Sequence, residues 1–193
     1  MTVRIYRDKE FELLEGVYDP GDDSFLLVEA ALKDIRAGEK VLEVGTGSGV
    51  VSFFVKDVTR VIATDINPIA CQNARLNGVE VVRTDLFSGI CGQFDVIIFN
   101  PPYLPTSEDE KLDTWLNRAF DGGPDGRDVI RQFLAGVKRI LPIGGRVLTV
   151  FSSLTDIDAV AELYRQHGFS VETVAREKVP FEVLVVFKCV RLS

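Results

Sequence analysis

The chain has 193 residues, of which 46% are hydrophobic and 26% charged, and its net charge at pH 7 is −7. This composition is typical of one folded domain and excludes a disordered chain, while the acidic charge argues against stable binding to a nucleic-acid duplex. No apolar run approaches the roughly 20 residues that cross a bilayer, and the charged N-terminus lacks a signal peptide's apolar stretch, so we expect a cytoplasmic protein without a membrane partner.

Hydrophobic periodicity predicts alternating helices and strands. The first helix, Asp23–Arg36, repeats apolar residues on one face and stops before Gly38. A long loop, Pro101–Gly126, interrupts the alternation. The remaining elements expected before the C-terminal strands are, in chain order, Lys40–Val44 (strand), Ser48–Val58 (helix), Arg60–Thr64 (strand), Pro68–Asn77 (helix), Glu80–Thr84 (strand), Phe94–Phe99 (strand), Arg127–Leu141 (helix), Arg146–Phe151 (strand) and Asp156–His167 (helix).

The last two strands, Ser170–Arg176 and Glu182–Val190, are joined by a link too short for a helix, so they should pair antiparallel. The whole pattern predicts an open α/β sheet of seven strands, mostly parallel, with a C-terminal antiparallel hairpin. Ligands bind such sheets at the carboxyl ends of the strands. We expect one domain over residues 1–193, in which residues 1–38 cap the ligand site and residues 39–193 form the core.

A glycine-rich turn, G-x-G-x-G, follows the first strand. Gly45 and Gly47 permit a tight turn and let a ligand approach the backbone closely. Val50 stands where a dinucleotide fingerprint has its third glycine. Taken alone, the turn is a weak signal, because a merely tight connection between a strand and a helix remains an alternative.

Three acidic residues accompany this turn. Asp65 ends the second strand, where its carboxylate can accept from both hydroxyls of a ribose. Asp85 ends the third strand and can accept from an adenine amino group, while the N–H of Leu86 meets a ring nitrogen. Glu43, within the first strand, can face a cationic amine. Asp85 alone is compatible with a cap or turn, but an adenosyl ligand carrying an amine and a sulfonium explains all three acids.

The fourth strand runs into Asn100, Pro101, Pro102 and Tyr103. Two prolines can simply end a strand, but this tetrapeptide also suits methylation of an amide-like nitrogen. Such a nitrogen is a poor nucleophile until its two N–H groups are drawn out of plane. The Asn100 side chain and the Pro101 carbonyl offer acceptors, the prolines add no competing donor, and Tyr103 offers a stacking face. We predict that these four residues are catalytic.

The ordered motifs VLEVGTGSG, TD, TDLF and NPPY resemble those of Rossmann-like class I S-adenosylmethionine (SAM)-dependent methyltransferases. The stretches Val17–Leu27 and Phe120–Ile130 are similar to the short archaeal and eukaryotic branch of HemK-like protein-glutamine methyltransferases. That branch modifies the glutamine of the GGQ motif in class I release factors. The helical N-terminal domain of the bacterial relatives is expected to be absent. Asp19 and Gly21 depart mildly from the Glu and Ala that are usual in the family.

The resemblance implies SAM as methyl donor, S-adenosylhomocysteine as product, and no metal in this chain. It also implies a small zinc-containing activator subunit on the edge of the third strand, which Val79, Val81 and Val82 make apolar. The alternative is that the chain packs this edge itself. The residues implied to hold the cofactor, including the glycine turn, are Ser24, Glu43, Gly45, Gly47, Asp65, Asp85 and Leu86.

Two other functions share these motifs. An adenine-N6 methyltransferase of DNA or RNA would apply the same chemistry to a flipped-out base, but the acidic charge and the lack of a recognition domain argue against it. A SAM-binding subunit without activity would not need an intact NPPY. The cysteines Cys71, Cys91 and Cys189 match neither a zinc site nor a disulfide framework, and His167 is expected at a helix end.

Overall fold

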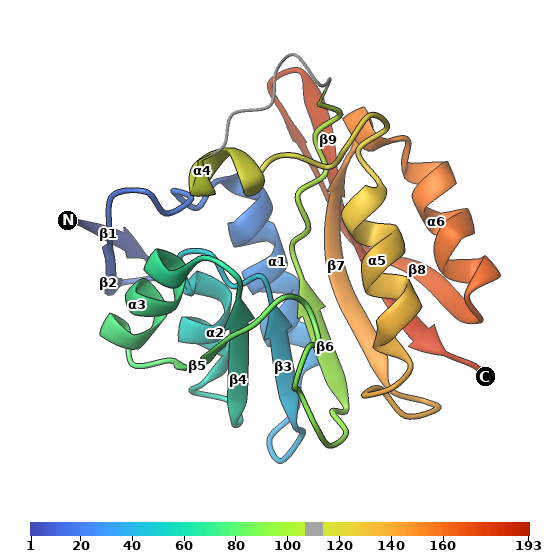
Figure 1. The fold of residues 1–193 in the computed structure, drawn as a ribbon, viewed down its shortest axis with the longest axis horizontal. Coiled ribbons are helices and arrows are strands. Elements are labelled where there is room, and N and C mark those ends of the chain that lie inside the picture. The colour runs from blue at the N-terminus through green and yellow to red at the C-terminus, as the bar shows by residue number, and fades with distance from the viewer. Residues whose placement is uncertain (107–113) are drawn as a thin grey trace.

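The computed structural model of the protein describes residues 1–106 and 114–193, and Figure 1 shows a small N-terminal hairpin beside a large sheet covered by helices. The elements in chain order are β1 (Thr2–Tyr6), β2 (Lys9–Leu13), α1 (Asp22–Asp34), β3 (Val41–Val44), α2 (Val50–Val55), β4 (Val61–Asp65), α3 (Pro68–Leu76), β5 (Glu80–Arg83), β6 (Val96–Phe99), α4 (Trp115–Arg118), α5 (Asp128–Val137), β7 (Arg146–Ser152), the 3-10 helix η2 (Ser153–Thr155), α6 (Ile157–Gln166), β8 (Phe169–Val179) and β9 (Glu182–Arg191).

The large sheet has seven strands in the order β5-β4-β3-β6-β7-β9-β8. Strands β3 to β7 are parallel, whereas β9 runs antiparallel to both β7 and β8. The mostly parallel sheet with a C-terminal antiparallel hairpin is therefore confirmed. The strand order reverses between β3 and β6, which leaves a crevice at the carboxyl ends of these strands.

Helices pack on both faces of the sheet because its central strands are apolar on both sides. All four residues of β6 are buried: Val96 and Ile98 contact the layer of α1 and α2, while Ile97 and Phe99 contact that of α5 and α6. Each fully buried side chain of this size contributes about 1.5–3 kcal/mol. These two cores hold the strand ends in fixed positions.

The N-terminal hairpin β1–β2 and the short helix α4 were not expected from the sequence. Phe11 of β2 is buried against the layer of α1 and α2, so the hairpin is part of that core. Helix α4 lies within the expected loop Pro101–Gly126, and residues 107–113 of that loop lie outside the described residues. In the described parts of the chain, no helix is both long and apolar enough to cross a bilayer.

Candidate active site

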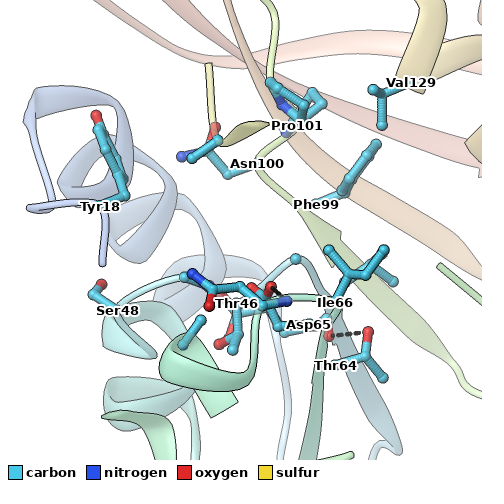
Figure 2. A pocket seen from close by; sticks show the side chains of 18 of the residues that line it. Tyr18, Thr46, Ser48, Thr64, Asp65, Ile66, Phe99, Asn100, Pro101 and Val129 are labelled. Carbon is cyan, nitrogen blue, oxygen red and sulfur yellow. Dashed lines mark hydrogen bonds between the residues drawn. The ribbon is translucent and has the colours of Figure 1, made fainter. Parts of the chain in front are cut away.

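A cavity of about 390 Å³ opens at the carboxyl ends of β3, β4, β5 and β6, a size typical of small-molecule sites. Figure 2 shows Asn100 and Pro101 on one side of it, with Thr46, Ser48 and Asp65 opposite. The structure brings all the predicted catalytic and cofactor-binding residues to this one cavity, namely Ser24, Glu43, Gly45, Gly47, Asp65, Asp85, Leu86, Asn100, Pro101, Pro102 and Tyr103.

The glycine turn after β3 lines the cavity and leaves space beside its backbone. Gly45 and Gly47 have φ angles of 66° and 53°, which favour glycine, and no atom lies within 4 Å of a Cβ built on either residue. The backbone N–H of Gly47 donates to Oδ2 of Asp65 at 2.8 Å. The turn is thus tied to the end of β4 and leaves room for a ligand against its backbone.

Asp65 is buried where β4 ends. Besides the bond from Gly47, its Oδ1 accepts from the Asn67 N–H at 2.8 Å. Burial raises the pKa of Asp65, although the backbone hydrogen bonds act in the opposite direction. Because a carboxylate has about four acceptor sites and each can be directed to a donor, Asp65 keeps acceptor capacity for a ligand hydroxyl.

Glu43 is buried within β3, and its carboxylate accepts hydrogen bonds from other residues of the protein. Oε2 accepts from the Thr46 hydroxyl at 2.6 Å, from the Ser52 N–H at 3.1 Å and from the Ser52 hydroxyl. Burial raises the pKa of Glu43 to about 7, partly offset by these bonds. A cation in the cavity would favour its ionised form.

Asp85 and Leu86 lie just beyond β5, which ends at Arg83 rather than at Thr84 as the sequence predicted. Asp85 is exposed, and its carbonyl accepts from the Ser88 N–H at 2.9 Å. Leu86 has a φ of 44°, an unusual conformation for a bulky residue. Strain of this kind clusters at ligand sites.

Asp23, which was not predicted as a site residue from the sequence, lies beside Asn100 in the cavity. It is 5% exposed, and its Oδ2 accepts from Nδ2 of Asn100 at 2.9 Å and from the Tyr103 hydroxyl at 3.4 Å. Its Oδ1 accepts from the Tyr18 hydroxyl at 3.0 Å and from both the N–H and the hydroxyl of Ser24. Asp23 therefore fixes the Asn100 amide so that Oδ1 of Asn100 is left as an acceptor.

Two tyrosines complete this cluster. Burial, followed by the negative charge of Asp23, raises the pKa of both Tyr18 and Tyr103 well above the usual range. Both hydroxyls consequently remain protonated at neutral pH and serve Asp23 as donors. Pro101 lines the same cavity beside Asn100, and its carbonyl is a second candidate acceptor there.

The segment after the tetrapeptide is held by a glycine-rich loop at residues 120–126. Leu104 exchanges backbone bonds with Phe120 and Gly122 at 3.1 and 3.0 Å. A Cβ on Gly126 would lie 2.4 Å from the Tyr103 carbonyl oxygen, so only glycine permits this approach. The Tyr103 carbonyl also accepts from the Thr155 hydroxyl at 3.0 Å, which ties the tetrapeptide to η2.

The cavity is acidic. Among residues 1–106 and 114–193, its lining includes no lysine, arginine or histidine, and those residues form no group of three or more side chains able to hold a metal ion. Its acidic lining residues are Asp23, Glu43, Asp65, Asp85 and Glu182. This charge suits a ligand with a net positive charge.

Residues 15–184 match the family described as the methyltransferase small domain. The chain is 45% identical over 191 residues to a putative protein N5-glutamine methyltransferase of Methanocaldococcus jannaschii, covering 95% of this chain and 96% of the relative. It is 33% identical to the methyltransferase HEMK2 of Homo sapiens, with 89% and 88% covered.

Among solved structures, the chain is similar to one in the E. cuniculi Mtq2–Trm112 complex, which is responsible for methylation of the termination factor eRF1. The TM-score is 0.78 and the identity 26%, with 91% of this chain and 99% of that chain covered.

Proposed function

This chain belongs to the methyltransferase small domain family, and from that membership we propose that it methylates the side-chain amide of the GGQ glutamine in a class I release factor. Two relatives that match almost its whole length support this substrate: one is named a putative protein N5-glutamine methyltransferase, and the other is named the catalytic subunit of an eRF1 methyltransferase. The observation that carries the proposal is the Asn100 amide, whose Nδ2 is bound by Asp23 so that its oxygen remains free.

The methyl donor is SAM, which supplies an electrophilic methyl group on a positively charged sulfur. The cavity fits it, since its lining is acidic and its glycine turn is open. We assign Asp65 to the ribose hydroxyls, Asp85 and Leu86 to the adenine, and Glu43 to the amino-acid part. Gly45, Gly47 and Ser24 complete the cofactor side of the cavity.

The residues after β6 prepare the substrate nitrogen. Oδ1 of Asn100 and the carbonyl of Pro101 accept its two N–H groups and draw them out of the amide plane, so that the lone pair becomes available. Pro102 keeps the segment extended and adds no competing donor. Tyr103 lies against the planar amide. The methylated nitrogen then loses a proton to solvent, so no general base with a tuned pKa is required.

A small zinc-containing activator, such as a Trm112-type subunit, is the proposed partner. The Mtq2 relative is found in a complex with Trm112. Strand β5 is an edge of the sheet, and Val82 on it is 43% exposed, close in sequence to the half-buried Val81. Val79, by contrast, is buried by the chain itself against Ala74 of α3. We place the partner at Val82, and we place the enzyme with its substrate in the cytoplasm.

The Asn100→Ala variant tests this assignment. It should bind SAM with a Kd close to that of the unaltered chain, while transfer to the release factor falls by about a hundredfold or more, because one acceptor for the amide is lost. Calorimetry gives the first quantity and transfer of labelled methyl gives the second. Undiminished turnover in this variant would remove Asn100 from the mechanism.

A further inference from the structure

The β8–β9 hairpin brings one more acidic side chain, Glu182, into the active-site cavity. Strand β9 is antiparallel to β7, and Leu184 pairs with Ser152 where β7 ends. The beginning of β9 therefore lies at the same edge of the sheet as the carboxyl ends of the parallel strands. Figure 1 shows this end of the hairpin near the segment that follows β6.

The carboxylate of Glu182 has an unused acceptor. Its Oε2 is buried, and among the residues that the structure describes it has no hydrogen-bond partner. The other buried acids of the cavity do have protein donors: Asn100 for Asp23, Gly47 for Asp65 and Ser52 for Glu43. Because buried polar atoms are nearly always paired, an unpaired carboxylate oxygen in a ligand cavity points to a donor on the ligand.

The place of Glu182 in the sheet puts it on the substrate side. Strand β9 is two positions from β6, on the side opposite to β3 and β4, which carry Glu43 and Asp65. Its negative charge contributes to the raised pKa of Tyr18 and of Tyr103. Glu182 is thus close to the tyrosines around Asn100 rather than to the proposed ribose site.

The turn before Glu182 presents an apolar side chain. Val179 pairs with Glu182, so Pro180 and Phe181 form a two-residue loop. Phe181 has a φ of 72° and is fully exposed. Turns with a proline followed by a positive φ normally use glycine at the second position, and a bulky residue there is strained. The ring is not buried in the free chain, so it is available for contact with another molecule.

We propose that Glu182 and Phe181 form a docking site for the polypeptide segment that carries the methyl-accepting glutamine. Oε2 of Glu182 accepts a hydrogen bond from an N–H donor of that segment, and the Phe181 ring packs against it. The donor is a backbone amide or a cationic side chain, which share this chemistry. The assignment rests on the proposed function, because it takes a protein as the substrate.

Steady-state kinetics with the intact release factor, using this chain together with a Trm112-type subunit, test the docking site. Glu182→Ala should raise the KM for the release factor about tenfold or more, with a smaller change in kcat and an unchanged Kd for SAM. Glu177→Ala is the matched control, since Glu177 is an exposed acid of the same hairpin outside the cavity. Glu182→Gln keeps an acceptor oxygen but loses the charge. If the donor is a backbone amide, the KM of this variant should be close to that of the unaltered chain. If the donor is a cationic side chain, its KM should lie between those of the unaltered chain and Glu182→Ala.

Phe181→Gly provides a second readout that a folding defect cannot imitate. It removes the ring and relieves the strained turn, so the KM should rise while the Tm stays equal or increases. Unchanged KM values in both variants would overturn the docking site, as would a parallel loss of SAM binding in Glu182→Ala. If the unaltered complex transfers no methyl group to the release factor, the proposed function itself fails, and this assignment fails with it.

Discussion

A single buried carboxylate accepts hydrogen bonds from four residues on the Asn100 side of the cavity. Asp23 accepts from Asn100 and Tyr103 through one oxygen and from Tyr18 and Ser24 through the other. All of these partners are hydrogen-bond donors, so the carboxylate fixes how they are oriented. We regard Asp23 as a positioning residue that acts through Asn100.

The Asp23→Asn variant tests this role. An amide at this position places an NH2 group opposite a donor and favours a flipped Asn100 side chain, whose NH2 would then face the substrate. We expect kcat to fall about a hundredfold while the Kd for SAM changes little. Kinetics and calorimetry measure these quantities, and Asp22→Asn, an exposed neighbour on α1, serves as control. Equal losses in both variants would refute the orienting role.

Glu43 makes the stability of the ligand-free protein depend on pH. Its pKa of about 7 in the folded chain lies above the ordinary value of 4.5, so its contribution to stability is complete below about pH 4.5 and is lost as pH rises through 7. That contribution is on the order of 3 kcal/mol. Glu43→Gln should therefore be more stable than the unaltered protein at pH 8 and similar at pH 5.

Urea unfolding at both pH values, without SAM, measures this difference. The same substitution should weaken SAM binding at pH 8, because it removes a carboxylate that faces a cationic ligand. In the unaltered protein, SAM should bind more tightly as pH rises from 6 to 8. A Glu43→Gln variant that is less stable at pH 8 would contradict the raised pKa.

The sequence predicted the acids and the tetrapeptide of the site because each follows a strand in a recognisable order. Asp23 escaped prediction because its partners Asn100 and Tyr103 lie 77 and 80 residues away. The conformation of Leu86 escaped it too, since no local pattern requires a positive φ at a leucine. Glu182 follows a turn that carries no recognisable motif. It lies in the cavity because β9 pairs antiparallel with β7, and the sequence does not show this pairing register.

At the scale of elements, the parallel core was predicted well and the N-terminal hairpin was not. Strands β3, β4 and β6 are short and mostly apolar, whereas β2 is rich in charge and β1 is almost entirely exposed. The hairpin is held instead by two asparagines of the α3 region. Asn73 accepts from the Leu14 N–H and Asn77 from the Glu12 N–H, both at 2.7 Å.

Asn73 links the hairpin to the glycine turn, because it also donates to the Ser48 carbonyl in that turn at 2.6 Å. It is fully buried. Asn73→Ala should lower the free energy of unfolding by about 2–4 kcal/mol, since it leaves buried backbone groups without partners. Urea denaturation measures the change. Gln72→Ala, at the exposed neighbouring position, should shift stability by about 0.5 kcal/mol or less, and a similar small effect at Asn73 would contradict this coupling.

For the whole molecule, the two edges of the sheet differ in how they are protected. Strand β8 carries a bulge between Thr173 and Ala175, a feature that discourages pairing with another chain. Strand β5 has a regular register with β4 and an exposed Val82. This difference supports the proposed placement of the activator subunit at β5.

Matched substitutions at the two edges test this placement. Val82→Asp should abolish co-purification with a Trm112-type subunit, because it puts a charge into an apolar interface. Val174→Asp, at a β8 residue that is 39% exposed, should leave the complex intact. Loss of the complex in both variants, or in the second alone, would move the interface away from β5.

The most direct test of the central claim is the position of the methyl group. The complex is incubated with labelled SAM and an intact class I release factor, with a single-stranded adenine-containing oligonucleotide in parallel, and the products are mapped by tandem mass spectrometry. We expect label on the side-chain amide of the GGQ glutamine and none on the oligonucleotide. Label on adenine alone, or on the release factor at a position other than that glutamine, would contradict the proposed function.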